Sequence, residues 1–508
     1  MPVSIDKQKL IVNKNIVKGA NTTWIEQDIL VPDTKPDVMK IIRIDSKVYI
    51  GTKEVSDGSI KVTGQITYYI IYLAMDGNIR GINMTYPYVK VIEDKNVKKD
   101  MRLRMNAIVR NVIYSLPNER KISVKTEVVF KYKLSEIGEI EILNTISDCE
   151  GLECKMSKDS FFNVLEYKTE MIEANEDVML PEAMPGVNEI LRVSNEIVNT
   201  EYKISYNKIL VKGDVKTNIV YTSSDDSGEM YSYEVNLPFT GMIEFSNISD
   251  NSKFDIQYAL KSFDISLDTS NEPYRMINMS AEVVADVLMY EEKEIEYIED
   301  FYSMEENLNY DKSGISIVKN KENIEKMISV KDNIGNVSDI SRLLDYTVDI
   351  SNLNTKISGS NVYINGNIKI NTMYELGKDK KTESKTYDML VDETVPMSKD
   401  VEEKYVTVNM EVTKAIVRLD NDNITADVDI MVKVNVDNVE SINQINDIKE
   451  EKVDFSQFDS MNIYIVKKGD NLWNIAKKYK TSVAKIANTN DIVDSNKLDI
   501  GQKLLIIR

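Results

Sequence analysis

A long internal repeat constrains the fold of this 508-residue chain more than any other feature. Residues 30–44 read LVPDTKPDVMKIIRI, and residues 179–193 read MLPEAMPGVNEILRV, at an offset of 179 − 30 = 149. Gly64 and Gly213 keep the same offset, since 213 − 64 = 149. A solenoid unit spans only about 20–50 residues. The sequence therefore predicts tandem globular domains.

A third and more diverged copy of the repeat begins near residue 340. Arg342 aligns with Arg43 and Arg192 of the earlier copies, and Gly366 aligns with their glycines, but the two prolines are missing. We therefore divide the chain into three repeats and a C-terminal part, with boundaries at 1–148, 149–298, 299–436, a linker at 437–460 and a last domain at 461–508.

Each repeat has the composition of β-strands. The segments 61–72, 211–221 and 361–374 are rich in β-branched and aromatic residues, which fit a pleated, half-buried surface. Short helices are expected at 37–44 and 338–344. The predicted fold is mainly β, with three tandem β-sandwich-like domains and a small α+β domain at the end.

Two residue types recur at fixed places in the copies. The glycines stand in mid-strand, which favours a bulge or a close backbone approach over a ligand role. For Arg43, Arg192 and Arg342 a structural ion pair is the favoured interpretation, and a shared interaction surface is the alternative.

The last 48 residues, 461–508, follow a strand–helix–helix–strand order. Gly469-Asp470 is a turn pair, and Asp470 is placed to cap a helix that starts near Asn471. Leu472 and the apolar residues three, four and seven positions later would form one buried helical face. This segment resembles a LysM module, whose family fold is βααβ and whose usual ligand is a polymer of N-acetylglucosamine.

The LysM resemblance implies a binding site between two loops. The backbone and amide groups of these loops would bond the sugar, while Leu472 and Ile492 pack against its methyl group. Asn471 stands where the family usually has Thr or Ser. Trp473 beside the first loop either offers a contact surface or packs partly buried under the helix. The candidate glycan- or partner-binding residues are Gly469, Asp470, Asn471, Leu472, Trp473, Asn490, Asp491, Ile492 and Val493.

The whole architecture resembles the SipL family of clostridial spore coat proteins. In that family, repeats called SPOCS domains precede a single C-terminal LysM module. The resemblance implies a role in the mother-cell cytoplasm at the forespore surface. It also implies that the LysM module docks onto the coat ATPase SpoIVA or another coat protein rather than onto glycan.

Charge and composition exclude several function classes. The net charge of −20 disfavours binding to nucleic acid. From residue 461 onward nine Lys or Arg and four Asp give 9 − 4 = +5, which leaves −25 elsewhere and suggests an acidic partner or simply a solvated surface. Histidine is absent, and Cys149 and Cys154 are the only cysteines, so we expect no triad, metal site, cofactor or disulfide framework. Neither a signal peptide nor a membrane span is expected.

The favoured function is a non-enzymatic scaffold of the spore envelope whose C-terminal module docks onto a coat partner. Peptidoglycan binding is the alternative, and a cell-wall hydrolase with a carboxylate pair ranks last. The charge-rich stretch 291–323 is expected to connect the second and third repeats. The linker at 437–460 would let the C-terminal module reach its partner independently.

Overall fold

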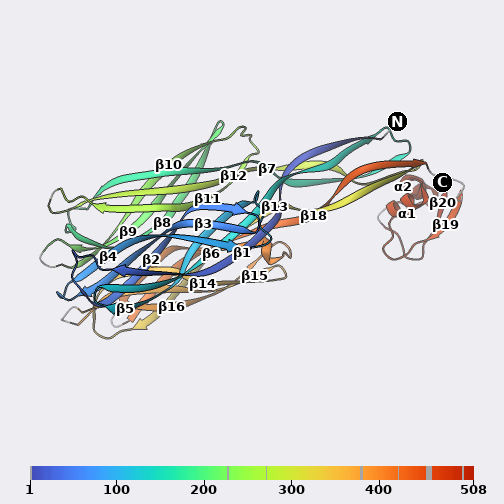
Figure 1. Ribbon diagram of the computed structural model, residues 1–508. Helices are drawn as coiled ribbons and strands as arrows, with labels where there is room; N and C mark the ends of the chain where they lie inside the picture. The colour runs from blue at the N-terminus through green and yellow to red at the C-terminus, as the bar shows by residue number, and fades with distance from the viewer. Residues whose placement is uncertain are drawn as a thin grey trace.

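The computed structural model describes residues 3–225, 228–270, 272–377, 381–420, 423–452, 460–494 and 497–507. Figure 1 shows three strand-rich bodies at one end, a narrow stalk of long strands, and a small helical module at the far end of the stalk. The predicted mainly-β class and the small α+β module are both confirmed.

Eighteen strands, β1 to β18, form three units of six strands each. Unit 1 contains β1 (Ser4–Leu30), β2 (Val38–Ser56), β3 (Ser59–Ala74), β4 (Ile79–Glu93), β5 (Arg102–Asn118) and β6 (Lys121–Ser147). Unit 2 contains β7 (Leu152–Met179), β8 (Val187–Ser205), β9 (Lys208–Ser223), β10 (Met230–Glu244), β11 (Lys253–Leu267) and β12 (Met276–Ser303). Unit 3 contains β13 (Glu306–Asn336), β14 (Ile340–Ser358), β15 (Asn361–Leu376), β16 (Lys381–Pro396), β17 (Val406–Asp420) and β18 (Asn423–Lys452), with a 3-10 turn at Glu403–Tyr405.

Every unit is a sandwich of two antiparallel sheets. The second, third and fourth strands of each unit form one three-stranded sheet, and the first, sixth and fifth strands form the facing layer. In units 1 and 3 these facing layers are joined through β1 and β13 into one six-stranded sheet of order β17-β18-β13-β1-β6-β5. Along β9, alternate side chains from Ile209 to Ile219 are buried, because successive residues of a strand point to opposite faces. Each sandwich closes over its own apolar cluster. Units 1 and 2 also share apolar contacts, since Tyr49 and Tyr69 of unit 1 belong to the unit 2 core.

The prediction of two short helices at 37–44 and 338–344 is wrong. Residues from Val38 form β2, and residues from Ile340 form β14. Both strands pair along their length with the next strand of the unit and contain β-bulges. The proline before β2 suggested a helix start, but the β-branched residues behind it favour a strand, and the neighbouring strand completes its hydrogen bonds.

The stalk is built from the outer ends of the first and sixth strands of each unit (Figure 1). Its core contains Leu10, Val12, Ile140, Ile142, Phe161, Ile295 and Ile317. The connection predicted at 291–323 is therefore strand, split between β12 and β13. The predicted linker is also strand as far as Lys452, where β18 pairs with β13, and residues 453–459 lie outside the described part. Charged residues on the stalk's solvent face hid the alternation in the sequence.

Strand register shows which residues are equivalent in the three units. Near their starts, β2, β8 and β14 each contain two successive β-bulges, and the residue after the second bulge is Arg43, Arg192 and Asp345, respectively. The equivalent of the two arginines in unit 3 is therefore Asp345 and not Arg342. The three residues lie opposite Ile71, Val220 and Met373.

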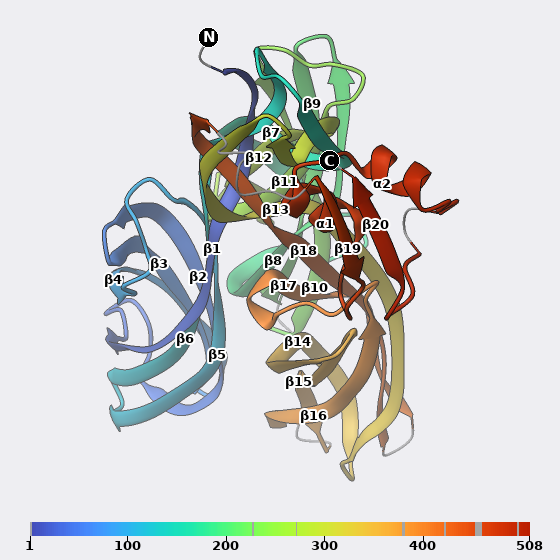
Figure 2. The same cartoon turned by 90° about the vertical axis from the view of Figure 1, so that its right-hand side faces the viewer.

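These residues meet where the three units join, at a contact that we call the junction (Arg43, Asp45, Arg192 and Asp345). Arg192 Nη2 lies 2.8 Å from Asp345 Oδ1, and Arg43 Nη1 lies 3.4 Å from Asp345 Oδ2. Arg43 Nη2 also donates to Asp45 Oδ1 at 3.0 Å. The predicted structural ion pair is thus confirmed for Arg43 and Arg192. Beside it lies an apolar layer drawn from all three units, formed by Ile71, Leu191, Val220, Leu344 and Met373. In Figure 2 the strands of unit 1 (blue) lie on the left, those of unit 3 (orange and brown) at the lower right, and those of unit 2 (green) extend between and above them.

The recurring glycines allow close packing in the first two units. A Cβ on Gly64 would lie 2.0 Å from the carbonyl oxygen of Tyr49, and one on Gly213 would lie 2.5 Å from the ring of Phe239. At Gly366 the nearest atom would be 3.7 Å away, which is an ordinary contact. The predicted close approach is confirmed at Gly64 and Gly213.

Candidate functional site

The C-terminal module has the predicted strand–helix–helix–strand order. It contains β19 (Met461–Ile465), α1 (Leu472–Tyr479), α2 (Val483–Thr489) and β20 (Lys503–Ile507). The two strands pair antiparallel, with Tyr464 opposite Leu504. The helices pack on one face of this sheet, and Ile475, Ala476 and Ile486 join the core between them.

The first loop is held by its own side chains. Gly469 has a φ of +90°, which suits glycine because it lacks a Cβ. Asp470 does not cap α1 as predicted. Its Oδ2 instead accepts hydrogen bonds from the Lys467 amide and the Tyr464 hydroxyl, both at 2.7 Å, and these bonds lower the pKa of Asp470. Asn471 is the true N-cap, since its Oδ1 accepts from the Asn474 amide at 2.8 Å.

The prediction that the Leu472 side chain contacts a ligand is wrong. Leu472 is 2 % exposed and lies in the module core, because the helical spacing turns it inward together with Ile475 and Ala476. Ile492 of the second loop is half-buried and packs against the same core. Both predicted loops therefore contribute a side chain to the same core, and the buried Leu472 side chain does not face solvent.

Asn490 has a structural role that the sequence did not reveal. Its Nδ2 donates to the carbonyl oxygens of Ile486 and Leu505, each at 2.8 Å, and its Oδ1 accepts from the Leu505 amide at 2.7 Å. The side chain thus links the end of α2 to β20, and it pairs with both backbone groups of Leu505 as a neighbouring strand would. A ligand that needed these amide atoms would have to break that join.

Four candidate residues remain accessible, and we call them the loop face (Gly469, Asn471, Asp491 and Val493). All four are exposed, and Val493 is completely so. Asp491 adopts a φ of +52°, which turns the chain sharply after α2. The loop face offers backbone amides, one carboxamide, one carboxylate and an apolar tip. These groups suit a polar ligand that carries methyl groups, such as an N-acetylated sugar or a protein loop.

Trp473 is half-buried and turned towards the stalk. Its Nε1 donates to Asp300 Oδ2 at 2.8 Å, and its ring meets the Tyr302 ring edge-on at 5.0 Å between centroids. Of the two interpretations of Trp473, the structure favours partial burial. The sequence does not indicate that Asp300 and Tyr302 contact Trp473, since single Asp and Tyr residues are common in a charged strand.

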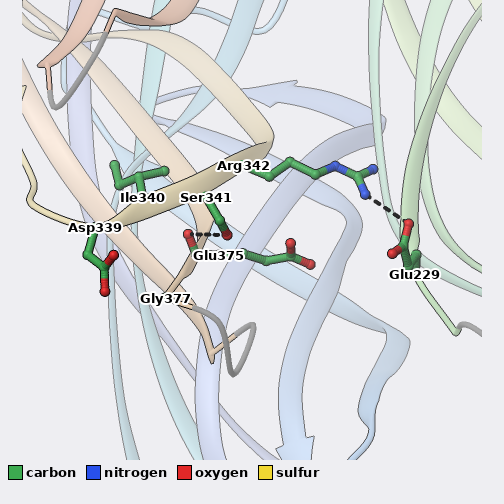
Figure 3. Close-up of a pocket in the computed structure, with 7 residues that line it drawn as sticks. All are labelled: Glu229, Asp339, Ile340, Ser341, Arg342, Glu375 and Gly377. Atoms are coloured by element: carbon green, nitrogen blue, oxygen red, sulfur yellow. Dashed lines mark hydrogen bonds and ion pairs between the residues drawn. The ribbon is translucent and has the colours of Figure 1, made fainter.

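A shallow pocket also lies between units 2 and 3. Figure 3 shows Arg342 reaching across it to Glu229, with an ion-pair distance of 3.1 Å. In unit 1 the hydroxyl of Tyr72 donates to the carbonyl of Pro36 in the proline segment. Unit 3 lacks that segment, so the pocket marks a shortened connection. Its lining is Glu229, Asp339, Ile340, Ser341, Arg342, Glu375 and Gly377.

Comparison with known families agrees with this architecture. A family model described as the SPOCS domain of SipL matches residues 37–117 and 186–268, and a LysM domain model matches residues 464–506. The SPOCS matches fall on the second to fifth strands of units 1 and 2. No solved structure matches the chain.

In the described ranges, the helices are all too short or too polar to cross a membrane. The matched domains are of binding type, and the SPOCS domain is matched twice before the C-terminal module. The chain thus has two regions that match the SPOCS domain of SipL, followed by a C-terminal region that matches a LysM domain.

Proposed function

We propose that the protein is a non-enzymatic scaffold of the spore coat whose LysM module docks onto a coat partner, such as a SpoIVA-like coat ATPase. The observation that carries the proposal is the placement of the module. It lies at the far end of the stalk, away from the three sandwiches (Figure 1), and its loop face is exposed. This arrangement suits a protein that holds one partner at a distance from its body.

We further propose that unit 3 is a third SPOCS-like copy. It has the same six-strand order and the same bulge positions as units 1 and 2. The junction joins all three units through buried charges. A body assembled in this way would be stiff, and stiffness helps a scaffold because less conformational freedom is lost when it binds.

The test is a pull-down with the full chain and variants of the loop face. Purified SpoIVA-like ATPase and insoluble peptidoglycan serve as separate baits. Docking on the coat partner predicts retention by the ATPase and loss of retention in Asp491→Lys. The matched control is Asp499→Lys, which makes the same charge change at an exposed site outside the loop face and should leave retention unchanged.

Peptidoglycan binding is the second candidate, and the match to the LysM domain favours it. The amides and carboxylate of the loop face could bond the hydroxyl and acetamido groups of the sugar. Retention on peptidoglycan alone, lost in Asp491→Lys, would select this function over docking on a coat protein. Equal retention of Asp491→Lys and the unaltered chain on both baits would refute the loop face as the site.

A further inference from the structure

Residues of the stalk complete the core of the LysM module. Tyr302 of β12 is 3 % exposed and belongs to the apolar cluster formed by the two helices and β20. Its ring lies against Trp473, and its hydroxyl donates to the carbonyl oxygen of Thr481 at 2.7 Å. A module cut from the stalk would therefore lose one of its own core side chains and expose the groups around it.

The carboxylate of Asp300, on the same strand, accepts hydrogen bonds from both the LysM module and the stalk. Asp300 accepts hydrogen bonds from Trp473 Nε1 at 2.8 Å, from Lys477 Nζ at 2.7 Å and from the Tyr310 hydroxyl at 2.7 Å. Its two oxygens thus bind a helix of the module and the neighbouring strand of the stalk together. Hydrogen bonds to an ionised group are about twice as strong as those between neutral groups.

A second lysine fixes the other end of α1. Lys480 Nζ donates to the carbonyl oxygens of Ser303 and Glu306, at 3.0 and 2.7 Å. These carbonyls flank the turn between β12 and β13, at the tip of the stalk. The module is therefore held to the tip of the stalk along α1 and at the turn that follows it, through Asp300, Tyr302 and the two carbonyl groups. We call Asp300, Tyr302 and the carbonyls of Ser303 and Glu306 the seat.

The seat and the loop face involve different surfaces of the module. The seat takes the side of α1 that carries Trp473, Lys477 and Lys480, whereas Gly469, Asn471 and Asp491 stay exposed while the module is seated. Two of the basic residues that suggested an acidic partner are thus already engaged within the chain. Opening of the seat is not needed to expose the loop face.

We propose that Asp300 and Tyr302 are positioning residues, which hold the LysM module in one orientation on the stalk tip, and that Trp473 serves this internal contact rather than a partner. The statement about Trp473 rests on the proposed function, whereas the existence of the seat does not. A module fixed in this way presents the loop face in a constant direction relative to the three units.

Tryptophan fluorescence of the full chain tests the seat directly. The chain has two tryptophans, so Trp24→Phe leaves Trp473 as the only tryptophan, and excitation at the long-wavelength edge of indole absorption selects its emission over that of the tyrosines. In this background, Asp300→Ala should shift the emission to longer wavelength and raise acrylamide quenching severalfold, because the indole gains water. Lys477→Met, which removes another partner of the same carboxylate, should produce a smaller shift.

The matched control is Glu299→Gln, which neutralises the adjacent carboxylate of the same strand, where Glu299 is exposed and pairs with Lys155. This variant should leave emission and quenching unchanged. Emission of Asp300→Ala that equals the control would overturn the seat, since Trp473 would then not depend on Asp300.

Binding assays separate the seat from the proposed function. Asp300→Ala should keep its retention on the ATPase or peptidoglycan bait, while Asp491→Lys should lose it without any change in emission. Stronger retention of Asp300→Ala would overturn the assignment of Trp473, because an uncovered Trp473 would then be a partner contact. If neither bait retains the unaltered chain, the proposed function fails, and the fluorescence result still decides the seat.

Discussion

Neutralising Asp345 should destabilise the whole body of the protein. The Asp345 side chain is 3 % exposed and lies between two arginines whose side chains are 4 % and 2 % exposed. Asp345→Asn keeps the size of the side chain and removes the charge. Arg43 and Arg192 would then share Asp45 as their carboxylate partner within the junction, and Asp45 is 25 % exposed.

The size of the effect follows from the burial of the two guanidinium groups. Removing one partner of a buried ion pair costs about 3–5 kcal/mol, because the remaining charge is left without compensation. The carboxamide introduced by Asp345→Asn would still offer one oxygen as an acceptor, so we expect the lower end, about 3 kcal/mol. That is a change of roughly a hundredfold in the folding equilibrium constant.

Arg342→Gln is the matched control, because Arg342 is the residue that simple alignment equates with Arg43. Its ion pair with Glu229 lies in the open pocket, with side chains 39 % and 26 % exposed. Exposed pairs contribute about 0–1 kcal/mol, so this variant should unfold almost like the unaltered chain.

Urea unfolding followed by circular dichroism measures the two effects. We expect a clearly lower midpoint for Asp345→Asn, and no more than a slight change for Arg342→Gln. Added salt should leave the deficit of Asp345→Asn in place, since buried charges are poorly screened. Equal midpoints for the two variants would refute the view that the junction holds the units together.

Two further predictions concern pH and the recurring glycines. Burial tends to raise the pKa of Asp255, but Lys321 and Arg104 outweigh burial and hold that pKa well below its usual range. The contribution of Asp255 to stability is therefore complete above pH of about 4 and lost as the pH falls further, so urea midpoints should drop steeply below that pH, and less steeply in Asp255→Asn. Gly64→Ala should lower the thermal unfolding temperature much more than Gly366→Ala, because a Cβ at Gly64 would meet a backbone oxygen at 2.0 Å and one at Gly366 would meet nothing closer than 3.7 Å. Similar melting temperatures for the two variants would contradict the close approach at Gly64.

The sequence alone was sufficient for the features that depend on local patterns. The repeat period, the strand-rich composition and the βααβ order of the last domain depend on residue spacing, and spacing is preserved when a chain folds. The two loops of the last domain could also be located, because the LysM resemblance fixes which segments follow the first strand and precede the last. The expected ligand contact of Leu472 was wrong, although the helical spacing of the apolar residues in the sequence had already indicated that this side chain is buried.

Only the tertiary structure decided the features that join distant segments. Alignment of the short motif by residue type selected Arg342, whereas strand pairing in the folded chain makes Asp345 the equivalent residue and places it beside Arg43 and Arg192. The strands of the stalk could not be predicted from the sequence, because the charged residues on their solvent face obscure the alternation of apolar and polar residues. Likewise, nothing near Trp473 in the sequence indicates Asp300 or Tyr302, which lie more than 170 residues away and reach it because the stalk returns the chain to the module.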